Sequence, residues 1–422
     1  MSRSPRFAPA FGLRCGAGPI LAVPRGSIHT PERTSLAEKI GAGTGEGTQT
    51  QGVDSPERLQ FPYMVWAHTS AVRSAYTLTQ SGMPLADPGF LDALGRYDIG
   101  HPSLEALPAL QAKLAELFRV DPSRVLVAVG ATGGMQLCAW RFFRPGARVV
   151  ADVPSYEPFR SLPMYLGADL RPLRRRLEDG WQVDPGEVRA LLGKGSSPGH
   201  VFLANLHNPT GVLLERERMA AIAAEAARVG GCLISCEVYM EYVPNERRVH
   251  AFELAPNGIS IGSLTKAYGL GALRIGWIVL GEGLARERAH LLDMAYLAYV
   301  DPPTAAMRAA RLALDRLPEL RRPIATVERE SRPIWERWLR TTPGIAATVP
   351  EFGIVAFPRV EGVEDTITLS EYLAKEHQVD VVPGEFFGLP GHVRISCGVP
   401  AATLAEALPR LERGIAAFRK RA

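Results

Sequence analysis

The chain has 422 residues, of which 46% are hydrophobic and 22% charged, and its formal net charge is +4. This composition is typical of a folded protein and allows a large core, so disorder over the whole length is excluded. No stretch comes near the ~18 apolar residues that a membrane helix needs. The charges are mixed in sign along the chain, so neither a membrane nor a nucleic acid is indicated as a partner.

Five cysteines stand at positions 15, 138, 232, 236 and 397, in no CxxC pair and in no cluster with histidine. An odd number of scattered cysteines is typical of a reducing compartment, where disulfides are rare. We therefore predict a cytoplasmic protein without a disulfide framework and without a bound metal.

The first 58 residues differ in composition from the rest. They are rich in Gly, Ser, Thr, Pro and Arg and have no sustained apolar period, which predicts a disordered tail over residues 1–58. Glu32 is the first acid, and five arginines precede or closely follow it, so a targeting segment stays open as an alternative. We expect residues 59–94 to form an N-terminal arm and part of a small domain.

Between residues 95 and 300, short apolar strands alternate with amphipathic helices. The expected elements are helix 104–118, strand 124–129, helix 135–143, strand 149–153, strand 200–206, helix 216–229, strand 232–237 and strand 259–262. Strands of this length and apolarity, separated by helices, are typical of a sheet that is covered on both faces. The pattern predicts a large α/β domain over residues 95–300, with a mainly parallel central sheet and helices on both faces.

The pattern changes after Asp301 to long helical stretches rich in Arg and Glu, which run to Leu339. The remaining expected elements are strand 353–357, helix 369–377, strand 379–382, strand 393–396 and helix 402–418. This predicts a second, smaller α+β domain over residues 301–422.

Polar and Gly-rich motifs follow several of the strands, at the place where open α/β sheets bind ligands. Gly130-Ala131-Thr132-Gly133-Gly134 opens a helix, whose dipole and free N–H groups suit a phosphate, although such turns are also common structural devices. Asn208-Pro209-Thr210-Gly211 and Cys236-Glu237-Val238-Tyr239, taken alone, suggest a tight turn and a core strand. Lys266 directly follows an apolar strand, and burial there would lower its pKa and make it a nucleophile for carbonyl groups.

In this order the motifs resemble the fold type I pyridoxal-phosphate enzymes, in particular the class I/II aminotransferase family, over about residues 60–422. The resemblance rests on Tyr97 with Gly100, Gly130–Gly134, Pro154-Ser155-Tyr156, Asn208–Gly211, Cys236–Tyr239, Ser263-Leu264-Thr265-Lys266 with Arg274, Pro383-Gly384, and Arg394. It implies the transferase fold of that family and pyridoxal 5′-phosphate as the cofactor.

The resemblance also implies which residues hold the cofactor. The backbone of Ala131 and Thr132, together with Ser263 and Arg274, would bind its phosphate. Tyr156 would stack on its ring.

Four residues would act in the chemistry itself. Lys266 would bind the cofactor and then serve as general acid and base. Asn208 and Tyr239 would hydrogen-bond the phenolic oxygen of the cofactor, and Arg394 would clamp the α-carboxylate of the substrate. Tyr97 would reach the cofactor phosphate of a neighbouring subunit, which implies a homodimer with shared active sites.

Cys236 departs from the family, which usually has Asp at this position, where the carboxylate pairs with the protonated ring nitrogen. A thiol is a weak donor and acceptor. Glu237 should not substitute, because successive side chains of a strand point to opposite faces. Loss of a charge-assisted hydrogen bond of roughly 1.5–3 kcal/mol would slow the reaction by about one to two decades, which favours chemistry that needs less charge delocalisation.

The leading hypothesis is an aminotransferase that moves an amino group between an α-amino acid and a 2-oxo acid by a ping-pong Schiff-base mechanism. The alternative is a pyridoxal-phosphate-dependent lyase, cyclase, decarboxylase or oxidase that acts on an amino acid, which Cys236 favours. A cofactor-binding protein without turnover is a third class, against which Lys266 and Arg394 argue.

The substrate side-chain pocket should draw on residues 63–66 and 79–83, with residues 296–300 as a further candidate segment. Ser81 and Asn208 are the candidate substrate-binding residues beside Arg394. The segments contain aromatic and apolar residues, and ordinary packing at the boundary between two domains would explain these residues equally well.

Overall fold

The computed structural model describes residues 61–69, 74–84, 104–194 and 197–421. All of them belong to one compact unit, Asp54–Ala422. The predicted tail and Tyr97 lie outside the described residues, and the division into domains at residue 300 stays a prediction. None of the described helices has the length and apolarity to cross a membrane.

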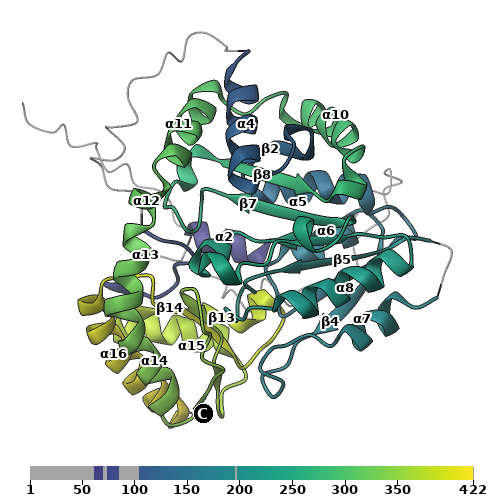
Figure 1. Ribbon diagram of the computed structural model, residues 1–422. Helices are drawn as coiled ribbons and strands as arrows, with labels where there is room; N and C mark the ends of the chain where they lie inside the picture. Colours follow the sequence, from purple (N-terminus) through teal and green to yellow (C-terminus); the bar gives the residue numbers. More distant parts are fainter. Residues whose placement is uncertain (1–60, 70–73, 85–103, 195–196, 422) are drawn as a thin grey trace, which may run out of the picture. The chain divides into compact units, whose positions relative to one another are not determined.

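A seven-stranded sheet forms the centre of the structure, with the order β2-β8-β7-β6-β5-β3-β4 (Figure 1). Neighbouring strands run parallel except at β8, which pairs antiparallel with both β2 and β7. The strands are β2 (Val125–Val129), β3 (Arg148–Val153), β4 (Asp169–Arg174), β5 (Gly199–Ala204), β6 (Leu233–Cys236), β7 (Gly258–Ser263) and β8 (Ile275–Leu280).

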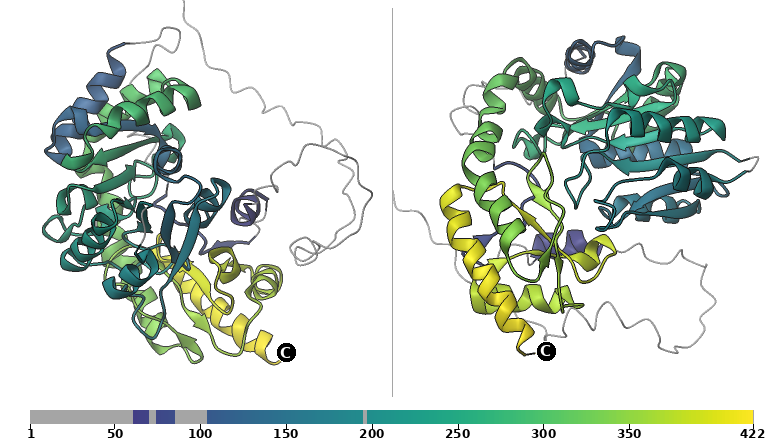
Figure 2. Two further views of the ribbon diagram at one scale, coloured as in Figure 1. Left: turned by 90° about the vertical axis from the view of Figure 1, so that its right-hand side faces the viewer. Right: turned by 60° about the horizontal axis from the view of Figure 1, so that its bottom comes forward.

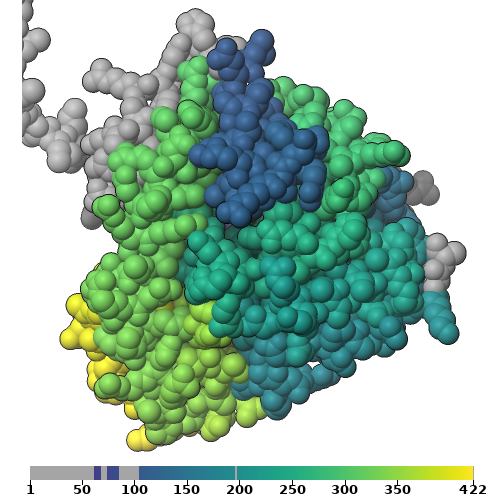
Figure 3. Space-filling view, in the orientation of Figure 1, coloured from purple at the N-terminus to yellow at the C-terminus, as the bar shows by residue number. Residues whose placement is uncertain are grey.

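Helices cover both faces of this sheet. One face packs against α5 (Gly130–Phe142), α6 (Pro158–Tyr165) and α10 (Glu287–Tyr299). The other face packs against α4 (Ala106–Phe118), α7 (Pro185–Leu192), α8 (Arg216–Arg228), α9 (Ala251–Leu254) and α11 (Thr304–Asp315). Figure 3 shows α4, in dark blue, exposed on the surface between α11 and α10. The arrangement confirms the predicted α/β fold with a mainly parallel sheet.

The burial of the strands explains why they consist of nearly continuous apolar runs. Every residue of β5 is buried, with Val201 and Leu203 in one core cluster and Phe202 and Ala204 in the other. A strand with helices on both faces has no solvent side, so the alternation of apolar and polar residues disappears. The sheet is therefore the core of the unit.

The C-terminal residues form smaller layers beside the central sheet (Figure 2, light green to yellow). Their helical segments are α12 (Leu317–Leu320), α13 (Arg322–Thr326), η6 (Val327–Ser331), α14 (Arg332–Thr341), α15 (Thr366–Tyr372), η7 (Leu373–His377) and α16 (Ala401–Arg419). Their strands are β9 (Ile345–Ala346), β10 (Val355–Ala356), β11 (Arg359–Val360), β12 (Val379–Asp380), β13 (Val382–Pro383) and β14 (Val393–Ser396). The order β10-β14-β13 makes a three-stranded antiparallel sheet.

The N-terminal arm lies against this C-terminal part. It contains α2 (Pro62–Thr69) and β1 (Tyr76–Thr77), and β1 pairs in parallel with β12. The backbone N–H of Ser396 donates to the carbonyl oxygen of Leu78 at 2.9 Å. Residues 74–84 are thereby held beside the strand that carries Arg394. Short turns complete the chain: η1 (Pro122–Arg124), η2 (Met240–Tyr242), η3 (Asn245–Arg247), η4 (Gly271–Leu273), η5 (Glu282–Leu284) and η8 (Gly384–Phe387).

Candidate active site

The candidate site residues gather at one edge of the central sheet. The carboxyl ends of its parallel strands meet there, so the segments after β2, β3, β5, β6 and β7 all emerge at this edge. Because β8 runs antiparallel, its first residues lie at the same edge, and Arg274 directly precedes β8. Arg274 precedes its strand and the other site residues follow theirs, yet all of them lie at the same edge, because β8 runs opposite to its neighbours.

The start of α5 and Arg274 form a cradle suited to a phosphate. Gly130 has a φ of +68°, and a Cβ added there would collide with the guanidinium of Arg274, so only glycine lets this cation approach the helix. Ala131 and Thr132 lie in the first turn of α5, where backbone N–H groups have no partner within the helix. Ser263 ends β7, and its Oγ accepts from the N–H of Thr265 at 3.3 Å.

Lys266 extends into the middle of this edge. Its Nζ donates a hydrogen bond to Ser81 Oγ at 2.8 Å. Burial lowers the pKa of this amine below its usual range; the nearby phenol of Tyr63 opposes the shift, and the charge of Arg394 adds to it. A lowered pKa leaves more of the amine unprotonated near neutral pH, which is what a nucleophile or base requires.

Tyr239 presents a buried hydroxyl that has no hydrogen bond of normal geometry to a described residue, although the Ser81 hydroxyl lies near enough to affect its pKa. Burial raises the pKa of this phenol, so it stays protonated and can donate. Asn208, also buried, follows β5, and its Oδ1 accepts from Nη1 of Arg394 at 3.1 Å. The Tyr239 hydroxyl is a buried donor without a partner, which is energetically costly. An oxygen atom of a bound cofactor would accept its hydrogen bond.

Arg394 on β14 is buried, with 1% of its surface exposed. Its Nη2 donates to Tyr63 Oη at 3.1 Å and to the carbonyl oxygen of Thr79 at 3.0 Å. Its Nε has no hydrogen-bond partner, and no ion pair to a described carboxylate compensates its charge. A planar cation held in this way is suited to a carboxylate ligand.

Aromatic rings line the space around Arg394 and Lys266. Tyr63 meets Tyr156 edge to face, with ring centroids 5.9 Å apart, and its ring lies 5.9 Å from Phe387. Burial would raise the pKa of Tyr63, but the charges of Arg394 and Lys266, together with hydrogen bonds to Arg394 and Ser81, outweigh burial and lower it. Tyr63 lies in a segment that the sequence predicts for the pocket, whereas nothing in the local sequence of Phe387 distinguishes it from a core residue.

Cys236 ends β6 and is buried among apolar residues of the sheet face that packs on α5. Burial raises the pKa of its thiol to about 12, so the group is neutral. Glu237 points to the opposite face, where its carboxylate accepts from Ser260 Oγ at 2.7 Å and pairs with His250 Nδ1 at 2.6 Å. Glu237 therefore does not take the place of the usual aspartate.

His207 supports the turn that carries Asn208. Its two ring nitrogens lie 2.7 Å from Thr210 Oγ1 and 2.9 Å from the carbonyl oxygen of Pro154. Burial lowers the pKa of this imidazole well below its usual range, so it is neutral. Both ring nitrogens are occupied by these contacts, so His207 is a structural residue rather than a base.

The residues present fit pyridoxal 5′-phosphate. The cradle at Gly130 suits its phosphate, and the unpartnered hydroxyl of Tyr239 suits an oxygen on its ring. The structure brings together the predicted site residues other than Tyr97, which lies outside the described residues.

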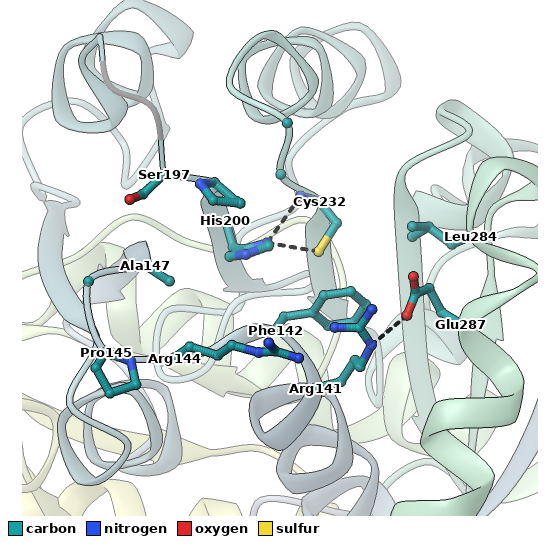
Figure 4. A pocket seen from close by; sticks show the side chains of 14 residues that line it. Arg141, Phe142, Arg144, Pro145, Ala147, Ser197, His200, Cys232, Leu284 and Glu287 are labelled. Atoms are coloured by element: carbon teal, nitrogen blue, oxygen red, sulfur yellow. Dashed lines mark hydrogen bonds and ion pairs between the residues drawn. The ribbon is translucent and has the colours of Figure 1, made fainter.

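A cavity of about 450 Å³ lies elsewhere, at the amino ends of β3, β5 and β6. Arg141, Arg144, His200, Cys232 and Glu287 are among the residues that line it (Figure 4). It contains none of the candidate site residues.

The chain belongs to the family described as aminotransferase class I and II, whose sequence pattern matches residues 99–411. Membership of this family confirms the resemblance seen in the sequence. Pyridoxal 5′-phosphate is the cofactor of this family and therefore of this protein.

Individual relatives differ in what they are named for. The chain is 31% identical to capreomycidine synthase of Streptomyces vinaceus, over 73% of this chain and 77% of the relative. It is 28% identical to arginine–pyruvate transaminase of Pseudomonas aeruginosa, over 76% and 84%. A crystal structure of a PLP-dependent aminotransferase from Streptococcus suis has the same fold, with a TM-score of 0.76 at 23% identity, over 86% of this chain and 99% of that chain.

Proposed function

We propose that this protein is an aminotransferase that moves an amino group between an α-amino acid and a 2-oxo acid. The observation that carries the proposal is that Lys266, a half-buried side chain whose amine has a lowered pKa, lies in one site with Arg394, a buried guanidinium that forms no ion pair with a described carboxylate. One supplies a base and the other a binding site for an α-carboxylate, and both are required by this reaction.

Each group at the site has a separate role in this reaction. When bound, pyridoxal 5′-phosphate supplies the aldehyde that takes up the amino group and the ring that withdraws electrons from the α-carbon. Arg394 holds the α-carboxylate and so orients the α-hydrogen. Lys266 Nζ would act as the base that takes up the proton of the α-carbon and as the acid that gives it back. Tyr239 would donate to the phenolic oxygen of the cofactor, and the cradle at Arg274 would hold its phosphate.

We also propose a homodimer with shared active sites. Thr132 and Arg274 of the cradle are exposed in the single chain, whereas Arg394 deeper in the site is buried. Apolar side chains are exposed on helices that pack against α5: Tyr165 (57%) on α6 and Leu297 (84%) on α10. A subunit contact over these helices would remove both side chains from water. Mass measurement in solution should give twice the chain mass of 45.8 kDa.

The cytoplasm is the compartment that we propose. Cys138, Cys232, Cys236 and Cys397 are buried free thiols, which suits a reducing environment.

A second candidate function is suggested by the neutral thiol of Cys236. Without a carboxylate at this position the ring withdraws electrons less strongly, which slows the proton shift of transamination and leaves a lyase, cyclase, decarboxylase or oxidase as the alternative. The similarity to a relative named capreomycidine synthase points the same way.

One experiment separates the two functions. Each of the twenty amino acids is mixed with the yellow holoenzyme, and loss of the visible absorbance is recorded while the products are identified. An aminotransferase bleaches with at least one amino acid and releases the matching 2-oxo acid. A different product without any 2-oxo acid, from any donor, would rule out the leading proposal.

A further inference from the structure

Ser81 makes a contact that joins two distant parts of the chain. Its Oγ accepts the hydrogen bond from Lys266 Nζ at 2.8 Å, although the two residues are 185 positions apart. Ser81 comes from the N-terminal arm, whereas Lys266 follows β7 of the central sheet. The contact therefore depends on how firmly the arm is held.

The backbone on either side of Ser81 is fixed. The N–H of Met83 donates to the carbonyl oxygen of Lys266 at 2.7 Å, and a Cβ added to Gly82 would lie 3.0 Å from the same oxygen. On the other side, the N–H of Leu78 donates to the carbonyl oxygen of Asp380 at 3.1 Å. Bonds to both parts of the fold thus aim the Ser81 hydroxyl at the amine.

Among the described residues, Ser81 is the hydrogen-bond acceptor of the Lys266 amine. Several other groups face the amine. They are Tyr63 from α2, Cys236 from β6, Arg274 before β8 and Arg394 from β14. Two of them are cations and one is a neutral thiol. None is a carboxylate that could hold a protonated amine in place.

We propose that Ser81 is a positioning residue for Lys266, which fixes the direction of the free amine and stabilises its protonated form. This inference rests on the proposed role of Lys266 as the base. Because the ammonium form donates to Ser81 Oγ, loss of the hydroxyl must make that form less stable. Removal of Ser81 therefore lowers the pKa of the amine further.

The first test measures that pKa directly in the full-length chain without bound cofactor, where the amine is free. The chain has six lysines, few enough for each 13C-labelled Cε signal to be resolved by NMR, and Lys266→Arg identifies the signal of interest. We expect the titration midpoint of Lys266 to fall by about one pH unit in Ser81→Ala, since a hydrogen bond to a charged group is worth roughly that much. Ser81→Thr, which keeps the hydroxyl, should restore it.

A matched control is Ser370→Ala. Ser370 Oγ is buried and donates only to the carbonyl oxygen of Val381 at 2.9 Å, away from the site. This variant should leave the Lys266 midpoint unchanged. An unchanged or raised midpoint in Ser81→Ala overturns the proposal, since a raised midpoint would mean that the hydroxyl donates to the neutral amine instead.

The second test uses the holoenzyme and an amino donor deuterated at the α-carbon. For Ser81→Ala we expect kcat to fall about tenfold with KM nearly unchanged, and the isotope effect on kcat to rise because proton transfer becomes slower. Ser81→Thr should recover both. An unchanged isotope effect contradicts the positioning role. If no amino acid is turned over at all, the proposed function fails, while the NMR titration still decides the role of Ser81.

Discussion

Replacement of Cys236 by Asp tests how the site handles charge on the cofactor ring. The thiol is 6% exposed, and its pKa of about 12 makes it neutral at physiological pH. The family resemblance places this residue beside the ring nitrogen, where an ionised Asp would pair with a protonated ring. A charge-assisted hydrogen bond of this kind contributes roughly 1.5–3 kcal/mol. If all of it acts on the barrier, the rate rises about 10- to 100-fold.

The assay is the single-turnover rate of the amino-donor half-reaction, followed by stopped-flow absorbance. Cys236→Asn is the matched control, because it has the size of Asp without the charge, and we expect its rate to stay within about threefold of the original chain. A rate for Cys236→Asp that is equal to or lower than that of the original chain, with the cofactor still bound, would refute the reasoning. It would mean that the thiol is suited to a different reaction.

Three further substitutions give distinct results. Arg394→Lys should raise KM for the amino donor at least about tenfold, because a point charge cannot reproduce the planar fork; an unchanged KM would contradict the carboxylate-binding role. Asp152→Asn should lower the free energy of unfolding by about 3–5 kcal/mol, since it leaves Arg175 buried without its partner, whose Oδ1 lies 2.9 Å from Arg175 Nε; a loss below about 1 kcal/mol in denaturant unfolding would argue against this pair. Burial raises the pKa of Glu157 to about 7, above its unfolded value, so its ionisation costs stability as pH rises from about 4.5 to 7. Glu157→Gln should therefore raise the melting temperature at pH 8 and leave it nearly unchanged at pH 4, and a gain at pH 4 alone would show the opposite sign.

The sequence predicted most of the central sheet, because buried strands such as β5 and β7 are short apolar runs between clear breaks. It missed β4, an edge strand in which Arg171 and Pro172 interrupt the apolar pattern. It also missed β8. The apolar run Ile275–Leu280 begins one residue after η4, and nothing in a buried apolar run indicates in which direction the strand crosses the sheet. The helix predicted from Met135 begins at Gly130, because the Gly-rich turn is itself the first turn of α5.

The candidate site was predictable from the order of its motifs, since each motif alone is common. What the sequence could not show is contact between distant segments. Asn208 and Arg394 are 186 positions apart and bonded, and no local pattern indicates this pairing. Ser81 was one candidate in a pocket segment, and only the folded arm places its hydroxyl on Lys266. Tyr97 stays a prediction, outside the described residues.

Borohydride reduction of the holoenzyme, followed by peptide mass spectrometry, tests the central claim most directly. The reduced cofactor should be found on the peptide that contains Lys266 and on none of the other five lysine positions. Lys266→Ala, run in parallel, should yield no modified peptide. Attachment at another lysine, or a covalent adduct that persists in Lys266→Ala, would contradict the assignment on which the whole account rests.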